Sequence, residues 1–235
     1  MLTDAGRAFL EQARAVLSRA ASAQLVLSEF GGLKRGALRL VASHTIAGYW
    51  LPRCLAAFRA LHPPITLELA IANTEQAKQS VLAGTAELGF VEGAVDDPDI
   101  VRWPIAYDRL VLVGAAPPPA VDKHWVRSAR WIMRERGSGA RSTFEEALQK
   151  MGVDPETLSI TLTLPSNEAV RTAVEAGAGV AVLSSLVVAG AIDSGGLNRY
   201  PLTLPERPFF ALRHRERYQT RAACALLDFI RKDTP

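Results

Sequence analysis

The sequence predicts an α/β fold with a parallel sheet that carries helices on its faces. Short apolar strands alternate with single helices along the chain, which is the pattern of βαβ units. Most strands are followed by Ser, Thr or Asn and then by a helix. The pattern breaks at Pro117–Pro119 and then resumes with the same plan. We therefore expect two similar α/β halves, with a boundary close to these prolines.

The composition is that of a globular protein of one large or two small domains. The chain has 235 residues, of which 49% are hydrophobic and 22% charged, with a net charge of +3. Without a long Lys/Arg run, this charge indicates a basic surface rather than a nucleic-acid face. Cys54 and Cys224 lie in apolar helical patterns and are predicted to be reduced core residues, which favours a cytoplasmic location. No apolar stretch is long enough to predict a membrane span.

Residues 4–31 form the longest helical pattern. Its apolar positions follow a heptad spacing: Phe9, Ala13, Val16, Ala20, Ala23, Leu27 and Phe30. Gly31 and Gly32 end the helix. Such a helix can pack on its own domain or pair with a partner helix. The alanines along the seam permit close approach, so we favour pairing.

The first half contains β-α-β-α-β and further strands. A strand over Leu38–Ala42 turns at Ser43-His44-Thr45 into a helix that carries Leu51, Leu55, Phe58 and Leu61. The next expected elements are strand Ile65–Ile71, helix Glu75–Leu82 capped by Asn73 or Thr74 and closed at Gly84, and strands Glu87–Val91, Ile100–Tyr107 and Arg109–Val113.

The second half repeats this plan. The expected elements are strand Trp131–Arg134, a glycine-containing turn Glu135–Gly139, helix Ala140–Met151, strand Ile160–Leu164, a helix from Ser166 or Asn167 to Ala176, strand Val180–Leu183 and a helix from Ser184. Strand Pro208–Arg213 and helix Thr220–Arg231 end the chain. We expect these last two elements to pack back on the first half.

The sequence shows no constellation for catalysis or metal binding. The carboxylate pairs Asp96-Asp97 and Glu145-Glu146 lie in a turn and on a helix surface, and the four histidines lack metal-ligand spacing. Gly137-Ser138-Gly139 is not followed by the Lys of a P-loop, and no serine lies in a nucleophile elbow. We therefore predict a protein that is not an enzyme and has no metal and no cofactor.

The strand ends are candidate ligand contacts. Four helix starts carry them: Ser43 with Thr45, Asn73 with Thr74, Ser138 with Gly139, and Ser166 with Asn167. Each pair alone is more often a helix cap than a ligand contact. If the halves face each other, the helix N-termini converge on one cleft that suits a small polar or anionic ligand. Glu92 would oppose an anion, so it either bonds to a donor of the ligand or points away.

Several stretches resemble the LysR-type transcriptional regulators. They are LTDAGRAFLEQARAVL, RGALRLVASHTIAGYWLPRCLAAFRALHP, LELAIANTEQAKQSVLAGTAELGFVEG, RERGSGAR and SNEAVRTAVEAGAGVAVLS. The resemblance covers almost the whole chain, in the family's order. Within the family, the chain resembles regulators of sulfur-assimilation or carbon-fixation genes, which have small anionic effectors.

The resemblance implies a type II periplasmic-binding-protein-like fold preceded by a long linker helix. Two subdomains are joined by two crossover strands, with the effector in the cleft between them. By this pattern residues 1–35 are a wing remnant and linker helix, residues 36–113 with 203–235 are subdomain I, and residues 114–202 are subdomain II. The implied effector contacts are Ser43, Thr45, Asn73, Thr74, Ser138, Gly139, Ser166 and Asn167. His44 lies at the same strand end, and with Glu92 it completes the predicted site.

The resemblance also implies partners. The linker helix pairs between subunits in the family, so we expect a homodimer or homotetramer through Phe9, Val16, Leu27 and Phe30. The family's winged helix-turn-helix, which reads DNA, is expected to be absent here, because the chain starts near the end of the wing. The predicted function is effector sensing and oligomerisation in a transcriptional regulator. The alternatives are a solute-binding protein and an enzyme of the same fold.

Overall fold

The computed structural model describes residues 36–93 and 95–233, together with a few positions nearer the N-terminus. Of these positions, residues 5–6, 9–10, 12–13, 16 and 20 are helical. Phe9 and Val16 are 73% and 66% exposed, so both are available to a partner. Leu27 and Phe30, which we also predict to pair, lie outside the described residues.

The sheet begins with a parallel arrangement in the first half. β1 (Gly36–Ser43) lies between β2 (Ile65–Ala72) and β3 (Leu88–Glu92), and both neighbours run parallel to it. The whole order is β2-β1-β3-β9-β4-β7-β5-β6, with β8 on β4. These strands confirm the predicted α/β fold, and the carboxyl ends of β1 and β3 place Ser43 and Glu92 at one edge.

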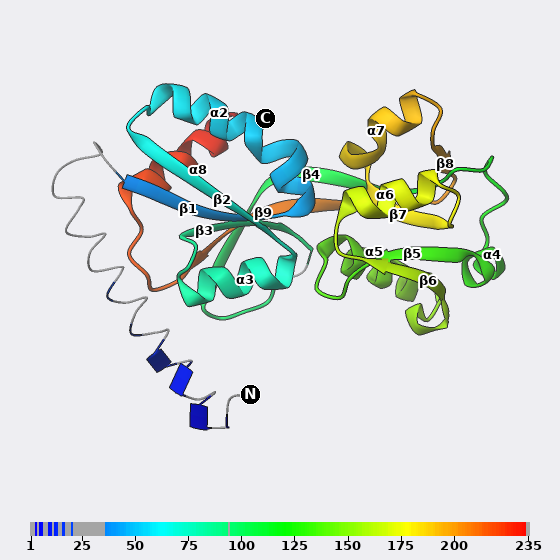
Figure 1. The fold of residues 1–235 in the computed structure, drawn as a ribbon, viewed down its shortest axis with the longest axis horizontal. Helices are drawn as coiled ribbons and strands as arrows, with labels where there is room; N and C mark the ends of the chain where they lie inside the picture. The colour runs from blue at the N-terminus through cyan, green and yellow to red at the C-terminus, as the bar shows by residue number, and fades with distance from the viewer. Residues whose placement is uncertain are drawn as a thin grey trace.

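Two long antiparallel strands connect the halves (Figure 1). They are β4 (Ile100–Gly114) and β9 (Glu206–His214). The prediction of two separate strands, Ile100–Tyr107 and Arg109–Val113, is wrong, because β4 runs through both with an irregularity between Pro104 and Ala106. Asp108, which interrupts the apolar pattern, is a buried position paired with Arg207 across the ladder.

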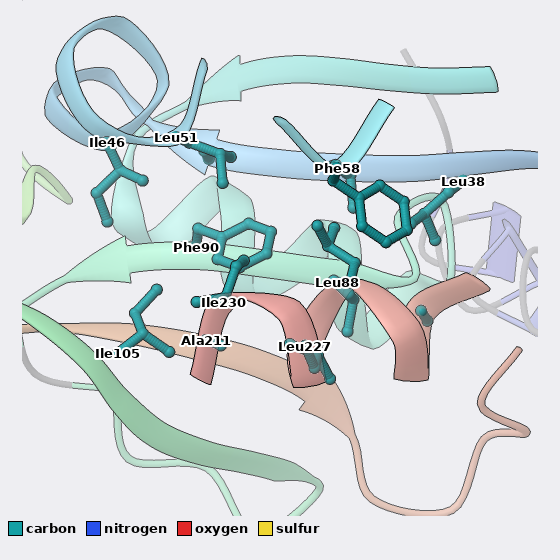
Figure 2. Close-up of a cluster of buried hydrophobic side chains, with 14 of the residues drawn as sticks. Leu38, Ile46, Leu51, Phe58, Leu88, Phe90, Ile105, Ala211, Leu227 and Ile230 are labelled. Atoms are coloured by element: carbon teal, nitrogen blue, oxygen red, sulfur yellow. The ribbon is translucent and has the colours of Figure 1, made fainter. Parts of the chain in front are cut away.

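Helices cover both faces of the first half. The π-helical turn η1 (Ile46–Trp50) leads into α2 (Leu51–Leu61), which lies with α8 (Arg221–Asp233) over one face. Phe58, Leu227 and Ile230 of these helices pack on Leu88 and Phe90 of β3 (Figure 2). On the other face, α3 (Thr74–Ala83) buries its Ala77 and Val81. The terminal elements β9 and α8 therefore return to the first half, as predicted.

The second half repeats this layering. β5 (Arg130–Arg134), β6 (Ser159–Leu164) and β7 (Val180–Ser184) are covered by α4 (Lys123–Ser128) and α5 (Gly139–Lys150) on one face, and by α6 (Asn167–Glu175) and α7 (Ser185–Asp193) on the other. The sequence predictions omitted α4, the 3-10 turn η2 (Pro155–Thr157) and β8 (Asn198–Tyr200). Each is too short to show periodicity.

The two cysteines differ in their burial. Cys54 is half-buried against the core, but Cys224 is exposed, so the prediction of two core cysteines is wrong for Cys224. Its face of α8 points to solvent while Ala223, Leu226 and Leu227 point inward. In the part of the chain that the structure describes, no helix is long and apolar enough to cross a membrane. The predicted boundaries of the linker and of the two subdomains stay predictions.

Candidate functional site: the cleft between the halves

The predicted site residues lie where the two halves meet. Seven of them are buried polar residues: Ser43, Thr45, Asn73, Thr74, Glu92, Ser138 and Asn167. Gly139 is also buried, while His44 and Ser166 are half-buried. Burial of so many polar groups requires hydrogen-bond partners.

A first polar bridge joins Thr45 of the first half to α6 of the second. The side-chain amide of Asn167 donates a hydrogen bond to Thr45 Oγ1 at 3.0 Å. Asn167 Oδ1 accepts from the guanidinium of Arg134, which also pairs with both carboxylate oxygens of Glu135 at 2.8 and 2.9 Å. Because Thr45 and Asn167 lie at helix starts in different halves, this hydrogen bond joins the two halves directly.

A second bridge starts at Asn73. Its Oδ1 accepts from Gln76 N at 2.9 Å, and Gln76 Oε1 accepts from Asn73 N at 3.1 Å, which is a capping box at the start of α3. The side-chain amide of Asn73 also donates to Glu135 Oε1 at 3.3 Å. Asn73 therefore both caps a helix and contacts the other half.

Gly139 brings the backbones of the halves into direct contact. A Cβ at this position would lie 2.0 Å from the carbonyl oxygen of Glu92 and 2.7 Å from Thr74 Oγ1. The same carbonyl accepts a 2.7 Å hydrogen bond from the hydroxyl of Thr74. No other residue than glycine permits this approach without a backbone shift. The described arrangement is thus a closed one.

Ser138 and Ser166 differ in how their hydroxyls are used. Ser166 Oγ accepts from Ala169 N at 3.1 Å, which is an ordinary N-cap. Ser138 precedes α5 without capping it, and its side chain makes no hydrogen bond with any described residue although Ser138 is only 3% exposed. A hydroxyl at a helix N-terminus that does not cap its helix is available to a ligand.

Glu92 belongs to a buried cluster at the hinge. We call Ser43, Glu92, Asp108, Ser184 and Arg207 the hinge cluster. Ser43 Oγ donates to Glu92 Oε2, and Glu92 Oε1 lies 3.7 Å from Arg207 Nη2. The carboxylate of Glu92 therefore faces a cation of the protein, and its role toward a ligand stays a prediction.

The rest of the hinge cluster lies on the crossover strands, with Asp108 on β4 and Arg207 on β9, and at the end of β7, with Ser184. Arg207 Nε and Nη2 donate to Asp108 Oδ2 at 2.9 and 2.7 Å, and Ser184 Oγ donates to Asp108 Oδ1 at 2.7 Å. Arg207 Nη1 is buried without a hydrogen-bond partner among the described residues. Sequence reasoning missed Asp108, Arg207 and Arg134; the only signal was a charged residue inside or beside an apolar strand.

The charges of the site shift three pKa values. Burial lowers the pKa of His44, the Arg134 charge lowers it further, and nearby carboxylates oppose both effects. Burial acts to raise the pKa of Glu135, but the hydrogen bonds and charge of Arg134 outweigh it and hold that pKa below its usual value. Burial and Glu168 raise the pKa of Tyr49, whose hydroxyl donates to Glu168 across the cleft at 3.2 Å.

Two α/β halves joined by two crossover strands, with polar helix starts facing each other, define a bilobal ligand-binding domain of the type II periplasmic-binding-protein-like class. A sequence model described as the LysR substrate binding domain matches residues 31–235. The chain belongs to the family of LysR-type transcriptional regulators and is an effector-sensing portion of such a regulator. A solute-binding protein is not favoured.

Individual relatives agree with this assignment. The chain is 30% identical over 235 residues to "Uncharacterized HTH-type transcriptional regulator YeiE" of Escherichia coli (strain K12), covering 97% of this chain and 78% of that protein. It is 32% identical over 188 residues to the activator CmpR of Synechocystis, covering 78% of this chain and 60% of CmpR. Among solved structures, the Synechocystis CcmR regulatory domain in complex with 2-PG has a TM-score of 0.76 at 25% identity, covering 85% of this chain and 98% of that chain.

Proposed function

We propose that this effector-sensing domain binds a small anionic ligand between its two halves. The observation that carries the proposal is the position of Ser138 at the N-terminus of α5: the residue is only 3% exposed, and its side chain does not cap the helix. The first turns of α3 and α6 begin beside it, at Thr74 and Asn167. Helix N-termini and hydroxyls together favour a negatively charged group.

The ligand site we propose consists of the ten predicted residues, in different roles. Ser138 and Thr45 supply hydroxyl donors, and Gly139 lets the backbone approach. Ser43 and Thr74 donate their protons to Glu92, so they offer a ligand only a hydroxyl oxygen as acceptor. Asn73, Ser166, Asn167 and Glu92 keep the cleft walls in place through their caps and bridges, and His44 stands at the rim. The complex of the CcmR regulatory domain with 2-PG supports a small organic ligand in this class of domain.

The proposed mechanism is a population shift between closed and open arrangements of the halves. A ligand changes this equilibrium only through its differential affinity for the two arrangements. The closed form already has the bridge from Thr45 to Asn167 and the bridge from Asn73 to Glu135. A ligand that contacts Ser43 and Ser138 together adds a further bond between the halves, so it favours closure.

A thermal-shift experiment tests this function. Sulfate, phosphate and small carboxylates are added to the wild-type chain, and the melting temperature is recorded. The double variant Ser43→Ala with Ser138→Ala should lose most of the stabilisation by any active anion. The control is Ser159→Ala, an exposed serine of β6. Equal stabilisation of the double variant and the wild type would place the ligand elsewhere.

The proposed partners follow from the family. We propose a homodimer or homotetramer through the helix that contains Phe9 and Val16, and we expect DNA contact only through a winged helix-turn-helix. We further propose a cytoplasmic location and no enzymatic activity. Light scattering at micromolar concentration should report a dimer or larger species. A monomer would contradict the pairing role. An operator-specific DNA complex of residues 1–235 would contradict the proposal that DNA is contacted only through a winged helix-turn-helix.

A further inference from the structure

The connection between β8 and β9 leaves a groove along the edge of β4. Both strands pair with β4 in the same direction: Tyr200 lies opposite Leu112, and Glu206 lies opposite Arg109. Glu206 follows Tyr200 by six residues, whereas their partners on β4, Leu112 and Arg109, are only three residues apart. The excess residues must therefore arch away from the sheet. Pro201 and Pro205 stand at the two ends of this arch and cannot donate to a ladder.

A cavity of about 790 Å³ lies under this arch. Its walls are Arg109 and Leu110 of β4, Pro118, Glu206 and the segment from Arg199 to Leu204; we call it the β8–β9 groove. Pockets for small organic molecules have volumes of roughly 300–1,000 Å³. The groove shares no lining residue with the ten predicted cleft residues, so it is a separate site.

The lining combines apolar side chains with an arginine near each end, and Thr203 and Glu206 add polar groups. Leu110 and Tyr200 are buried, and the hydroxyl of Tyr200 donates to Ala116 O at 3.0 Å, so its ring is left to face apolar neighbours. Leu202 and Leu204 are half-buried against the core of the second half. At one end Arg199 is exposed and has no ion pair with any described residue. At the other end Arg109 is paired with Glu206 at 2.6 Å.

We propose that the β8–β9 groove is a second ligand site, which takes an organic anion with an apolar body. The carboxylate or sulfonate of such a ligand pairs with Arg199, and its hydrocarbon part covers Leu110, Leu202 and Leu204. An inorganic anion would pair with Arg199 but leave the apolar part of the lining uncovered. A bound ligand lies against β4 and reaches Glu206 of β9, so it contacts both strands that connect the halves.

Octanoate is a suitable probe, and amide chemical shifts of the whole chain show where it binds. We expect saturable shifts at Arg199 and Leu202–Leu204. Arg199→Glu, at an exposed position, should fold normally and weaken octanoate binding about fivefold or more, as expected for reversing one exposed ion pair. The matched control Arg53→Glu, an exposed arginine of α2, should bind octanoate like the wild type. Acetate, which has the charge without the apolar body, should bind at least tenfold more weakly.

Several outcomes would overturn this inference. Shifts centred on Ser43–Thr45 and Ser138–Gly139 would assign octanoate to the cleft. If Arg199→Glu and the wild type bind octanoate with equal affinity, Arg199 does not recognise the acidic group. If acetate and octanoate bind the wild type with equal affinity, the apolar side chains do not recognise the hydrocarbon part. Shifts at the groove that depend on protein concentration would indicate a second copy of the chain as the occupant. Ser138→Ala distinguishes the two sites, because it should lower the affinity of the cleft for anions and leave the affinity of the groove for octanoate unchanged.

Discussion

Replacing Arg207 by Met should destabilise the domain strongly. Arg207 is 2% exposed and donates two hydrogen bonds to Asp108, at 2.9 and 2.7 Å, while its Nη2 lies 3.7 Å from Glu92. Met has a similar length but no charge. The variant would therefore leave two buried carboxyl groups at the hinge without their cation.

The expected magnitude follows from this burial. Breaking a buried ion pair by removing one partner costs about 3–5 kcal/mol, because the remaining charge stays desolvated and unpaired. A domain is stable by only about 5–15 kcal/mol, so the variant should have a much lower midpoint of unfolding. Asp108→Asn combined with Arg207→Met should recover part of the loss, since one of the two uncompensated carboxylates is then removed.

Urea unfolding followed by circular dichroism measures this effect. The control is Arg109→Met, which lies beside the cluster on β4 and removes an ion pair with Glu206 whose side chains are 70% and 51% exposed. An exposed pair contributes about 0–1 kcal/mol, so the control should remain close to wild type. If Arg207→Met and Arg109→Met lose the same free energy of unfolding, or if Arg207→Met loses less than about 1 kcal/mol, the hinge cluster does not stabilise the folded domain as argued.

Three further predictions concern the cleft. Gly139→Ala should shift the halves toward an open arrangement, because its Cβ would lie 2.0 Å from the Glu92 carbonyl oxygen; labels on the two halves should report a longer distance, and an unchanged distance would contradict the close contact. Ser138→Ala should change the free energy of unfolding by less than about 0.5 kcal/mol, as measured in urea, because its hydroxyl has no hydrogen bond to lose. His44→Gln should flatten the decrease in melting temperature between pH 7 and pH 5. Because burial and Arg134 lower the folded-state pKa of His44, the unfolded chain takes up its proton first, near pH 6.5, and wild-type stability falls as the pH drops below that value. The pKa of His214 is also lowered, and this residue is present in both the wild type and the variant. If the melting temperature of His44→Gln falls with pH as steeply as that of the wild type, His44 does not contribute to the pH dependence.

Local patterns were sufficient for most elements and for the polar residues at the strand ends. Hydrophobic periodicity and helix caps depend only on residues that are close in the sequence. The local sequence therefore predicts the alternation in β1 and β2, the caps Asn73 and Ser166, and the left-handed Gly84. Polar residues at successive strand ends were predictable for the same reason. The continuous strand β4 was not predictable, because Asp108 looks like a break until Arg207 lies opposite it.

The sequence by itself determined the layered α/β plan, the family resemblance and the set of polar strand ends. Only the tertiary structure decided how these ends are used. Glu92 faces Arg207, which lies on a strand more than a hundred residues later in the chain. The side chain of Asn167 donates to Thr45, and Gly139 lies against the backbone of β3. The physical reason is that pairing of buried charges and exclusion of a Cβ depend on distances across the two halves, and no local period of the sequence encodes those distances.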